Sequence, residues 1–201
     1  MILSNTSIQE ALDHRWLVID PEPTPRRPVQ DGPGCPYQTS AVDLRLSAEI
    51  VRPRDDLPVS IDLRRGGYAA LAQASHDPFN LTQEQPFNLE PRQLVLGRTI
   101  ERVCLPIPED DTTPCYAARI EGRSSFARCG LLVHFTAPTI HAGFDGVLVL
   151  EMCNFGPYTI QLYENMRVCQ LIIERVSGVP FRNDSQFQGQ DAPAGPPARE
   201  R

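Results

Sequence analysis

Two stretches decide the organisation of the chain: Gly122-Arg123-Ser124-Ser125-Phe126-Ala127-Arg128-Cys129-Gly130 and Gly146-Val147-Leu148-Val149-Leu150-Glu151-Met152-Cys153. The first places two hydroxyls and two guanidiniums close together in the chain. The second places one carboxylate, Glu151, in the middle of an apolar run. Core packing explains neither pattern. Together they indicate an anion-binding site that contains a proton-transfer group.

The second stretch is typical of a strand, because it is a short apolar run with turn residues around it. Alternate side chains of a strand point to opposite faces, so Glu151 shares its face with Val147, Val149 and Cys153. The other face is apolar as well, and we expect the carboxylate to be at least partly buried. Burial alone raises the pKa of a carboxyl group, which suits a group that takes and returns a proton. The alternative is a structural carboxylate paired with an arginine such as Arg128.

The first stretch predicts a short helix over residues 124–129, with Ser124 as N-cap and Gly130 as its stop. Free backbone N–H groups in a first helical turn bind anions, and Arg123 adds a guanidinium suited to phosphate oxygens. Ser124 and Arg128 are four residues apart, so they share a helix face and can hold one small group, such as a water molecule. The alternative is a capped surface helix with two solvated arginines.

The remaining pattern indicates a mainly β fold. Runs separated by turn residues predict strands at 41–46, 131–136, 146–153, 158–163 and 167–176, with a weaker signal at 59–63. Residues 93–105 are predicted to form either a strand pair or one long bent strand. A helix is predicted over residues 5–14, capped by Ser4, and the 20 prolines favour ordered loops such as 21–36. Many short strands with one or two short helices indicate a β-barrel or a jelly-roll-like sandwich. We expect one domain over 1–180, with its N-terminal helix and arm in 1–36, and a mobile tail over 181–201.

Composition restricts the class of protein. The net charge of −6 argues against broad binding to nucleic acids or anionic membranes, although a few arginines suffice for a small anionic ligand. The chain shows neither an apolar run long enough for a membrane span nor a secretory signal. Its six cysteines form no CxxC pair, so we expect free thiols and a cytoplasmic location. Zinc-dependent nucleobase deaminases carry H-x-E and P-C-x-x-C, and this sequence contains neither. It also lacks GxGxxG, P-loop and G-x-S-x-G motifs.

At these residues the chain resembles the dCTP deaminase family of the trimeric dUTPase-like β superfamily. The most specific match is the Arg-Ser-Ser segment quoted above, and the others follow in the family's order. The matching segments are residues 1–4, 17–21, 40–46, 122–128, 133–137, 143–151 and 187–190.

The resemblance implies a dUTPase-like distorted jelly-roll, a homotrimer with active sites between subunits, and deamination without zinc. Magnesium would be bound only through the triphosphate. Glu151 would be the proton shuttle, and Ser124 and Arg128 of a neighbouring subunit would orient the attacking water. The implied nucleotide-binding residues are Arg123, Ser125, His134, Phe135, Thr136, Ala137, His141, Phe187 and Gln190.

Four departures from the family pattern are present. His141 stands where the family usually has an aspartate that contacts the sugar and, in dUTPase relatives, serves diphosphate hydrolysis. Gln186 replaces a lysine before the aromatic Phe187, so one phosphate contact is missing. The Pro-Thr that commonly follows the closing motif is absent from residues 191–195, and the acidic loop 109–114 is longer than expected.

The leading hypothesis is therefore a dCTP deaminase that produces dUTP and ammonia. The first alternative is a dUTP diphosphatase, or a bifunctional enzyme that also removes diphosphate, which His141 argues against. The second is a non-catalytic nucleotide-binding relative, which the presence of Ser124, Arg128 and Glu151 argues against.

Overall fold

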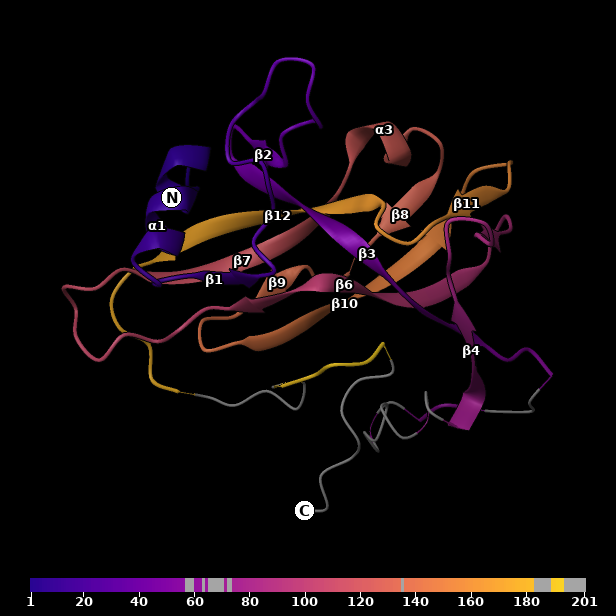
Figure 1. Cartoon of the computed structure of the whole chain (residues 1–201). Helices are drawn as coiled ribbons and strands as arrows, with labels where there is room; N and C mark the ends of the chain where they lie inside the picture. The colour runs from indigo at the N-terminus through magenta and orange to yellow at the C-terminus, as the bar shows by residue number, and fades with distance from the viewer. Residues whose placement is uncertain are drawn as a thin grey trace.

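The computed structural model describes residues 1–56, 60–62, 64, 71, 74–134, 136–182 and 189–193. Within these ranges the chain forms two helices and twelve strands (Figure 1). The helices are α1 (Asn5–Asp13) and α3 (Ser124–Ala127). The strands are β1 (Val18–Asp20), β2 (Tyr37–Gln38), β3 (Ala41–Pro53), β4 (His76–Asn80), β5 (Phe87–Leu89), β6 (Leu94–Cys104), β7 (Cys115–Gly122), β8 (Leu131–Val133), β9 (Thr139–Ile140), β10 (Asp145–Asn154), β11 (Ile160–Leu162) and β12 (Arg167–Val176).

The long strand β3 joins two halves of one curled antiparallel sheet. In the described part of the chain the order is β8-β10-β6-β3-β12-β7-β9, with β1 on β6 and with β2 and β4 on β3. The first half of β3 pairs with β12 through Arg45, and its second half pairs with β6 from Leu46 onward. Figure 1 shows β3 running diagonally across the other strands, as a strand shared between two halves must. The sheet therefore curls around one apolar core, as expected for a distorted jelly-roll.

The pairing of β6 with β10 contains an irregularity. Two buried side chains of β6, Thr99 and Glu101, accept backbone N–H groups of the neighbouring strands in this region. Between the pairs Val147–Arg102 and Val149–Arg98, β10 contributes Leu148 alone, whereas β6 contributes residues 99–101. The Leu148 N–H donates to Thr99 Oγ1 at 3.0 Å. Because backbone groups at a bulge lose their ladder partners, a side-chain acceptor at this point restores the missing bond.

Glu101 accepts a backbone N–H group of the other neighbouring strand, β3. Its fully buried carboxylate accepts the Arg45 backbone N–H at 2.9 Å and the Arg45 Nε at 2.7 Å. One side chain thus satisfies a backbone donor and neutralises a guanidinium. The carboxylate fixes β6 against β3 at the level where β6 also meets β10.

Helix α1 closes one end of the core as its sequence predicts. Ser4 Oγ accepts the N–H of Ser7, and Ile8 and Ala11 are buried. The segment before the helix is fixed to β12 by the Leu3 N–H, which donates to the Ile173 carbonyl at 3.0 Å. In Figure 1, α1 and α3 lie near opposite ends of β12.

Most predicted elements are present, although β7 and several of the shortest strands were not predicted. The segment 93–105 forms one long strand, β6 (Leu94–Cys104), and the strand predicted over 41–46 continues to Pro53. The strand predicted over 131–136 ends at Val133, because the next residue, His134, adopts a left-handed φ of 54°. In the weak strand signal over 59–63, the described residues 60–62 form no strand, and residues 59 and 63 lie outside the described part.

Replacing Glu101 by glutamine tests how much this side chain stabilises the packing of β6 against β3. The substitution removes the charge that neutralises Arg45 and places an amide group against the buried network. We expect the free energy of unfolding to fall by about 2–4 kcal/mol in urea denaturation. The matched control is Glu49→Gln, whose half-exposed carboxylate pairs with Arg98 at 2.6 Å and whose loss should cost less than about 1 kcal/mol. Equal costs for the two variants would contradict the role given to Glu101.

Candidate active site

Glu151 lies on β10 and is paired with His134 of its own chain. The His134 Nδ1 lies 2.6 Å from Glu151 Oε2, and the His134 backbone N–H donates to the Glu151 carbonyl at 2.8 Å. The ring contact is a close ion pair, and the buried Nδ1 makes no regular hydrogen bond in the described part of the chain. The Glu151 side chain is 40% exposed and that of His134 only 13%. The expectation of a partly buried carboxylate is confirmed, and its partner is a histidine rather than Arg128.

The direction of the Glu151 pKa differs from the sequence-based expectation. Burial raises the pKa of this carboxyl group, but the hydrogen bond and positive charge of His134 outweigh burial and bring the pKa below its ordinary value. Burial likewise lowers the pKa of His134, and the carboxylate of Glu151 reverses the shift and raises it. The expected pKa near neutrality is therefore wrong for this chain, because the sequence pattern gave no sign of an adjacent imidazole. The carboxylate is held in its ionised form.

The Arg-Ser-Ser segment forms a shorter helix than predicted, with a different cap. Helix α3 covers only Ser124–Ala127, and its N-cap is Arg123, which makes no side-chain cap bond. The Arg123 carbonyl accepts the N–H groups of Phe126 and Ala127. The prediction of Ser124 as N-cap is therefore wrong. Arg123 is anchored by its own side chain at the end of β7, so the helix begins immediately after it and the hydroxyl of Ser124 is exposed.

Arg123 is held by contacts on three sides. Its Nη1 donates to the Arg167 carbonyl at 3.1 Å and lies 3.7 Å from the buried carboxylate of Asp43. Its guanidinium carbon lies 5.4 Å from the centre of the Phe126 ring. Asp43 is fixed in turn by the side-chain amide of Gln170, which donates at 2.8 Å. These contacts place Arg123 between β3 and β12, whereas Ser125 and Arg128 are exposed.

The loop after α3 is fixed by a close crossing of two glycines. A Cβ on Gly130, whose φ is +96°, would lie 2.2 Å from the backbone nitrogen of Gly156. A Cβ on Gly156 would lie 2.3 Å from the Cys129 carbonyl oxygen. The Phe155 N–H donates to the Gly130 carbonyl at 2.8 Å. Only glycine allows this approach, which ties the helix-bearing loop to the end of β10.

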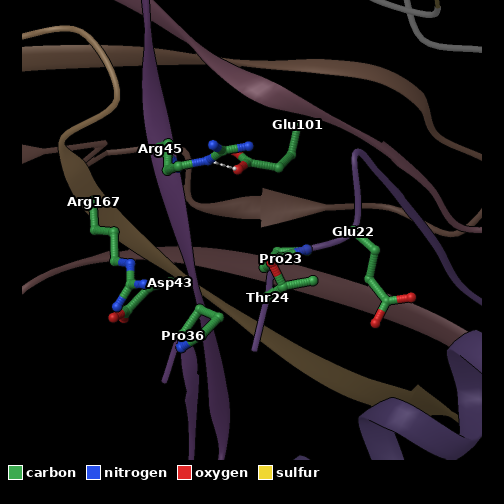
Figure 2. A pocket seen from close by; sticks show the side chains of 8 residues that line it. All are labelled: Glu22, Pro23, Thr24, Pro36, Asp43, Arg45, Glu101 and Arg167. Carbon is green, nitrogen blue, oxygen red and sulfur yellow. Dashed lines mark hydrogen bonds and ion pairs between the residues drawn. The ribbon is translucent and has the colours of Figure 1, made fainter. Parts of the chain in front are cut away.

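A pocket of about 120 Å³ lies beside Arg123, between the N-terminal arm and the sheet (Figure 2). Its charged lining from the sheet consists of Asp43, Arg45, Glu101 and Arg167. Figure 2 shows Arg45 directed at Glu101. Arg167 lies directly opposite Arg45 in the β3–β12 pair, and its guanidinium has no hydrogen-bond or ion-pair partner among the described residues. Because Glu101 neutralises Arg45, Arg167 is the lining guanidinium that could pair with an anion entering the pocket.

Sequence reasoning missed these pocket residues. Asp43 and Arg45 belong to a strand that was predicted from its pattern, and no role was assigned to its charged positions. The available signal was the one that identified Glu151, namely a charge within a strand pattern. Here Asp43 and Glu101 are almost completely buried, and a sequence does not show which face of a shared strand is covered.

The other predicted binding residues occupy different surroundings. Thr136 and Ala137 follow the end of β8 without strand structure, and His141 is exposed after β9. Gln190 is buried, with its side-chain amide donating to the Val147 carbonyl at 2.9 Å and its own carbonyl accepting the Val147 N–H. Phe135 and Phe187 lie outside the described residues. Residues 189 and 190 thus rest against β10 of the same chain, at Asp145 and Val147.

Other features of the described chain bear on the class of protein. No group of three or more His, Cys, Asp or Glu side chains in the described part is arranged to hold a metal ion. No helix among the described residues is long and apolar enough to cross a membrane. All six cysteines are free.

Comparisons with known proteins agree with this architecture. A family model described as dCTP deaminase-like matches residues 2–176. A "dCTP deaminase, dUMP-forming" of Dictyoglomus turgidum is 33% identical over 198 residues, covering 96% of this chain and 92% of the relative. A protein of the same description from Methanosphaera stadtmanae is 32% identical over 210 residues, covering 96% of this chain and 91% of the relative.

Among solved structures, 2′-deoxycytidine 5′-triphosphate deaminase from Agrobacterium tumefaciens matches with a TM-score of 0.59 and 19% identity. The match covers 88% of this chain, and this chain spans about half, 48%, of that protein. The structural match bears on the fold alone, and it confirms the expected mainly β, dUTPase-like architecture.

The His134–Glu151 pair predicts a pH window for stability. Because the pair raises the pKa of His134, it adds to the free energy of unfolding. This contribution is fully present below pH 6.5, the ordinary histidine pKa, and is lost as the pH rises through the folded-state pKa. The lowered glutamate pKa gives stability that is present above 4.5 and is lost as the pH falls through the folded-state pKa. We expect the stability difference between wild type and Glu151→Gln to be largest between these values. A difference that does not change from pH 4 to 8 in denaturant titrations would contradict the pairing.

Proposed function

The chain belongs to the dCTP deaminase-like family, and we propose that it converts dCTP and water to dUTP and ammonia. The observation that carries the proposal is Glu151, a half-buried carboxylate kept ionised on β10. An ionised carboxylate next to a neutral pyrimidine ring can accept a proton from water without a metal ligand set. The family match adds the substrate class to this chemistry.

In the proposed reaction, Glu151 takes a proton from the attacking water as the oxygen bonds to C4 of cytosine. It delivers that proton to N3, which neutralises the charge that develops on the ring. It then takes the second proton from the new hydroxyl and gives it to the amino group, which leaves as ammonia while the C4 carbonyl forms. Water supplies both protons, so Glu151 ends the cycle ionised as it began.

We propose that Ser124 and Arg128 reach this reaction from a neighbouring subunit of a homotrimer. Both side chains are exposed on α3, and neither makes a side-chain hydrogen bond or ion pair among the described residues. Within one chain, the Glu151 carboxylate is paired with His134 instead. A hydroxyl and a guanidinium brought up to Glu151 would orient the water and stabilise the charge at C4. This arrangement accounts for functional residues that have no partner in a single chain.

The pocket beside Arg123 is proposed to receive part of the triphosphate. Its volume of about 120 Å³ is below the roughly 300–1,000 Å³ of complete small-molecule sites, so it fits a phosphate group rather than a nucleotide. Arg167 and Arg45 line it, and Arg123 lies 3.7 Å from the carboxylate of the lining residue Asp43. We assign Ser125, which is exposed on α3, to the phosphates as well. Magnesium would enter with the triphosphate as part of the substrate. Gln190, at the β10 edge, would close over the bound nucleotide.

A second candidate is continued hydrolysis of dUTP to dUMP and diphosphate. The curated relatives from Dictyoglomus turgidum and Methanosphaera stadtmanae are described as dUMP-forming, which favours it. His141 argues against it, because the family usually has an aspartate at that place. Six free cysteines support a cytoplasmic location for either activity.

Product analysis with dCTP and Mg²⁺ tests the proposal. We expect one ammonia for each uracil nucleotide, with dUTP accumulating and no diphosphate released. Glu151→Gln should bind dCTP with unchanged affinity and lose about 10²–10⁴-fold in rate. Glu49→Gln is the matched control and should keep the wild-type rate.

Two other outcomes of this product analysis would change the assignment. Formation of dUMP together with diphosphate would support the second candidate. Absence of ammonia from the wild-type protein, with dCTP bound, would overturn the assignment as a deaminase.

A further inference from the structure

His134 holds Glu151 by two contacts that originate from one residue. Its backbone N–H donates to the Glu151 carbonyl at 2.8 Å, and its ring Nδ1 lies 2.6 Å from Oε2. The first contact extends the pairing of β8 with β10 by one residue, and the second adds the side chain to that pairing. The carboxylate is therefore fixed through its own strand and through its terminal oxygen.

The backbone of His134 is strained at the point where the ring meets the carboxylate. Its φ of 54° lies in the left-handed region, which is unfavourable for a histidine. The turn interrupts the strand directly after Val133, so the ring does not follow the alternation of β8. Strain of this kind persists where the surrounding structure determines it, and it is often found at functional sites.

No other charged side chain in the described part of the chain forms an ion pair with Glu151. On β6, Arg98 lies opposite Val149, but its guanidinium is paired with Glu49 of β3 at 2.6 Å. The neighbouring strand β8 faces β10 with apolar residues. Among the described residues, His134 makes the only ion pair with Glu151. With Oε2 taken, the exposed part of the carboxylate is left to face water or substrate.

We propose that His134 is a positioning residue for the proton-transfer carboxylate. The ring fixes Oε2, so that the other oxygen is aimed at the attacking water, and it keeps Glu151 ionised before substrate binds. The ring retains its own proton throughout, and the proton that moves is the one that Glu151 takes from water and delivers to N3. This role rests on the proposed function, and it is distinct from contact between residue 134 and the base.

The test is His134→Asn, because asparagine tolerates the left-handed backbone but is too short to reach Oε2 as the ring does. We expect kcat to fall about 10–100-fold while KM for dCTP stays within about twofold. Loss of the positive partner raises the pKa of Glu151, so the acid limb of the kcat/KM profile should move to higher pH. The matched control is His14→Asn at the exposed end of α1, which should leave both quantities unchanged.

A second readout needs no substrate. In an NMR titration of the full chain, the His134 ring should titrate above its ordinary value of 6.5 and should shift to lower pH in Glu151→Gln. Unchanged kcat and acid limb in His134→Asn would overturn the positioning role, as would identical titration of the ring in wild type and Glu151→Gln. A wild-type protein without deaminase activity would overturn the proposed function and this role together, whereas failure of the variant results alone would overturn only the role of His134.

Discussion

The structure depends on the buried carboxylate of Glu101, which joins two strands at the point where the sheet is irregular. Strand β6 pairs with β10 on one side and β3 on the other. The pairing with β10 shifts register between residues 98 and 102 of β6, and the pairing with β3 shifts between residues 97 and 99. Thr99 supplies the missing acceptor to β10, and Glu101 supplies it to β3 through Arg45. A buried backbone N–H without a hydrogen-bond partner lowers the free energy of unfolding. By accepting these N–H groups, the two side chains stabilise the irregular register. The register in turn sets where Glu151 lies along β10.

The candidate site occupies an interruption in the outer edge of β10. Strand β8 covers the edge at Met152 to Asn154, and residues 189 and 190 cover it near Asp145 and Val147. Glu151 and His134 lie between these two coverings. An open sheet edge is normally protected, and among the described residues the edge of β10 is left uncovered between these two segments, beside the carboxylate.

The sequence predicted the elements that depend on local pattern. The capped helix at Ser4 and the strand carrying Glu151 follow from side-chain periodicity and capping chemistry, and both are present. The resemblance gave the family, which the residue pattern alone did not reach. It did not reveal that Glu151 is paired with His134, because a left-handed φ at a histidine has no sequence signature and strand prediction continued to residue 136.

The pocket beside Arg123 could not be predicted for a related reason. Asp43, Arg45 and Arg167 come from strands far apart in the chain, and their meeting depends on the register between β3 and β12. The cap of α3 was misassigned because Arg123 is fixed by contacts with Asp43 and the Arg167 carbonyl. These are tertiary constraints that override the capping preference of a neighbouring serine.

The central claim is that one active site combines Glu151 of one subunit with Ser124 of another. The direct measurement is the deaminase activity of mixed oligomers formed from Glu151→Gln and Ser124→Ala chains, each of which should be inactive alone. Random mixing in equal amounts should restore about a quarter of the wild-type activity, because some interfaces then combine an intact glutamate with an intact serine. Activity that stays at the level of the separate variants, although mass measurement shows that subunits have exchanged, would contradict the account.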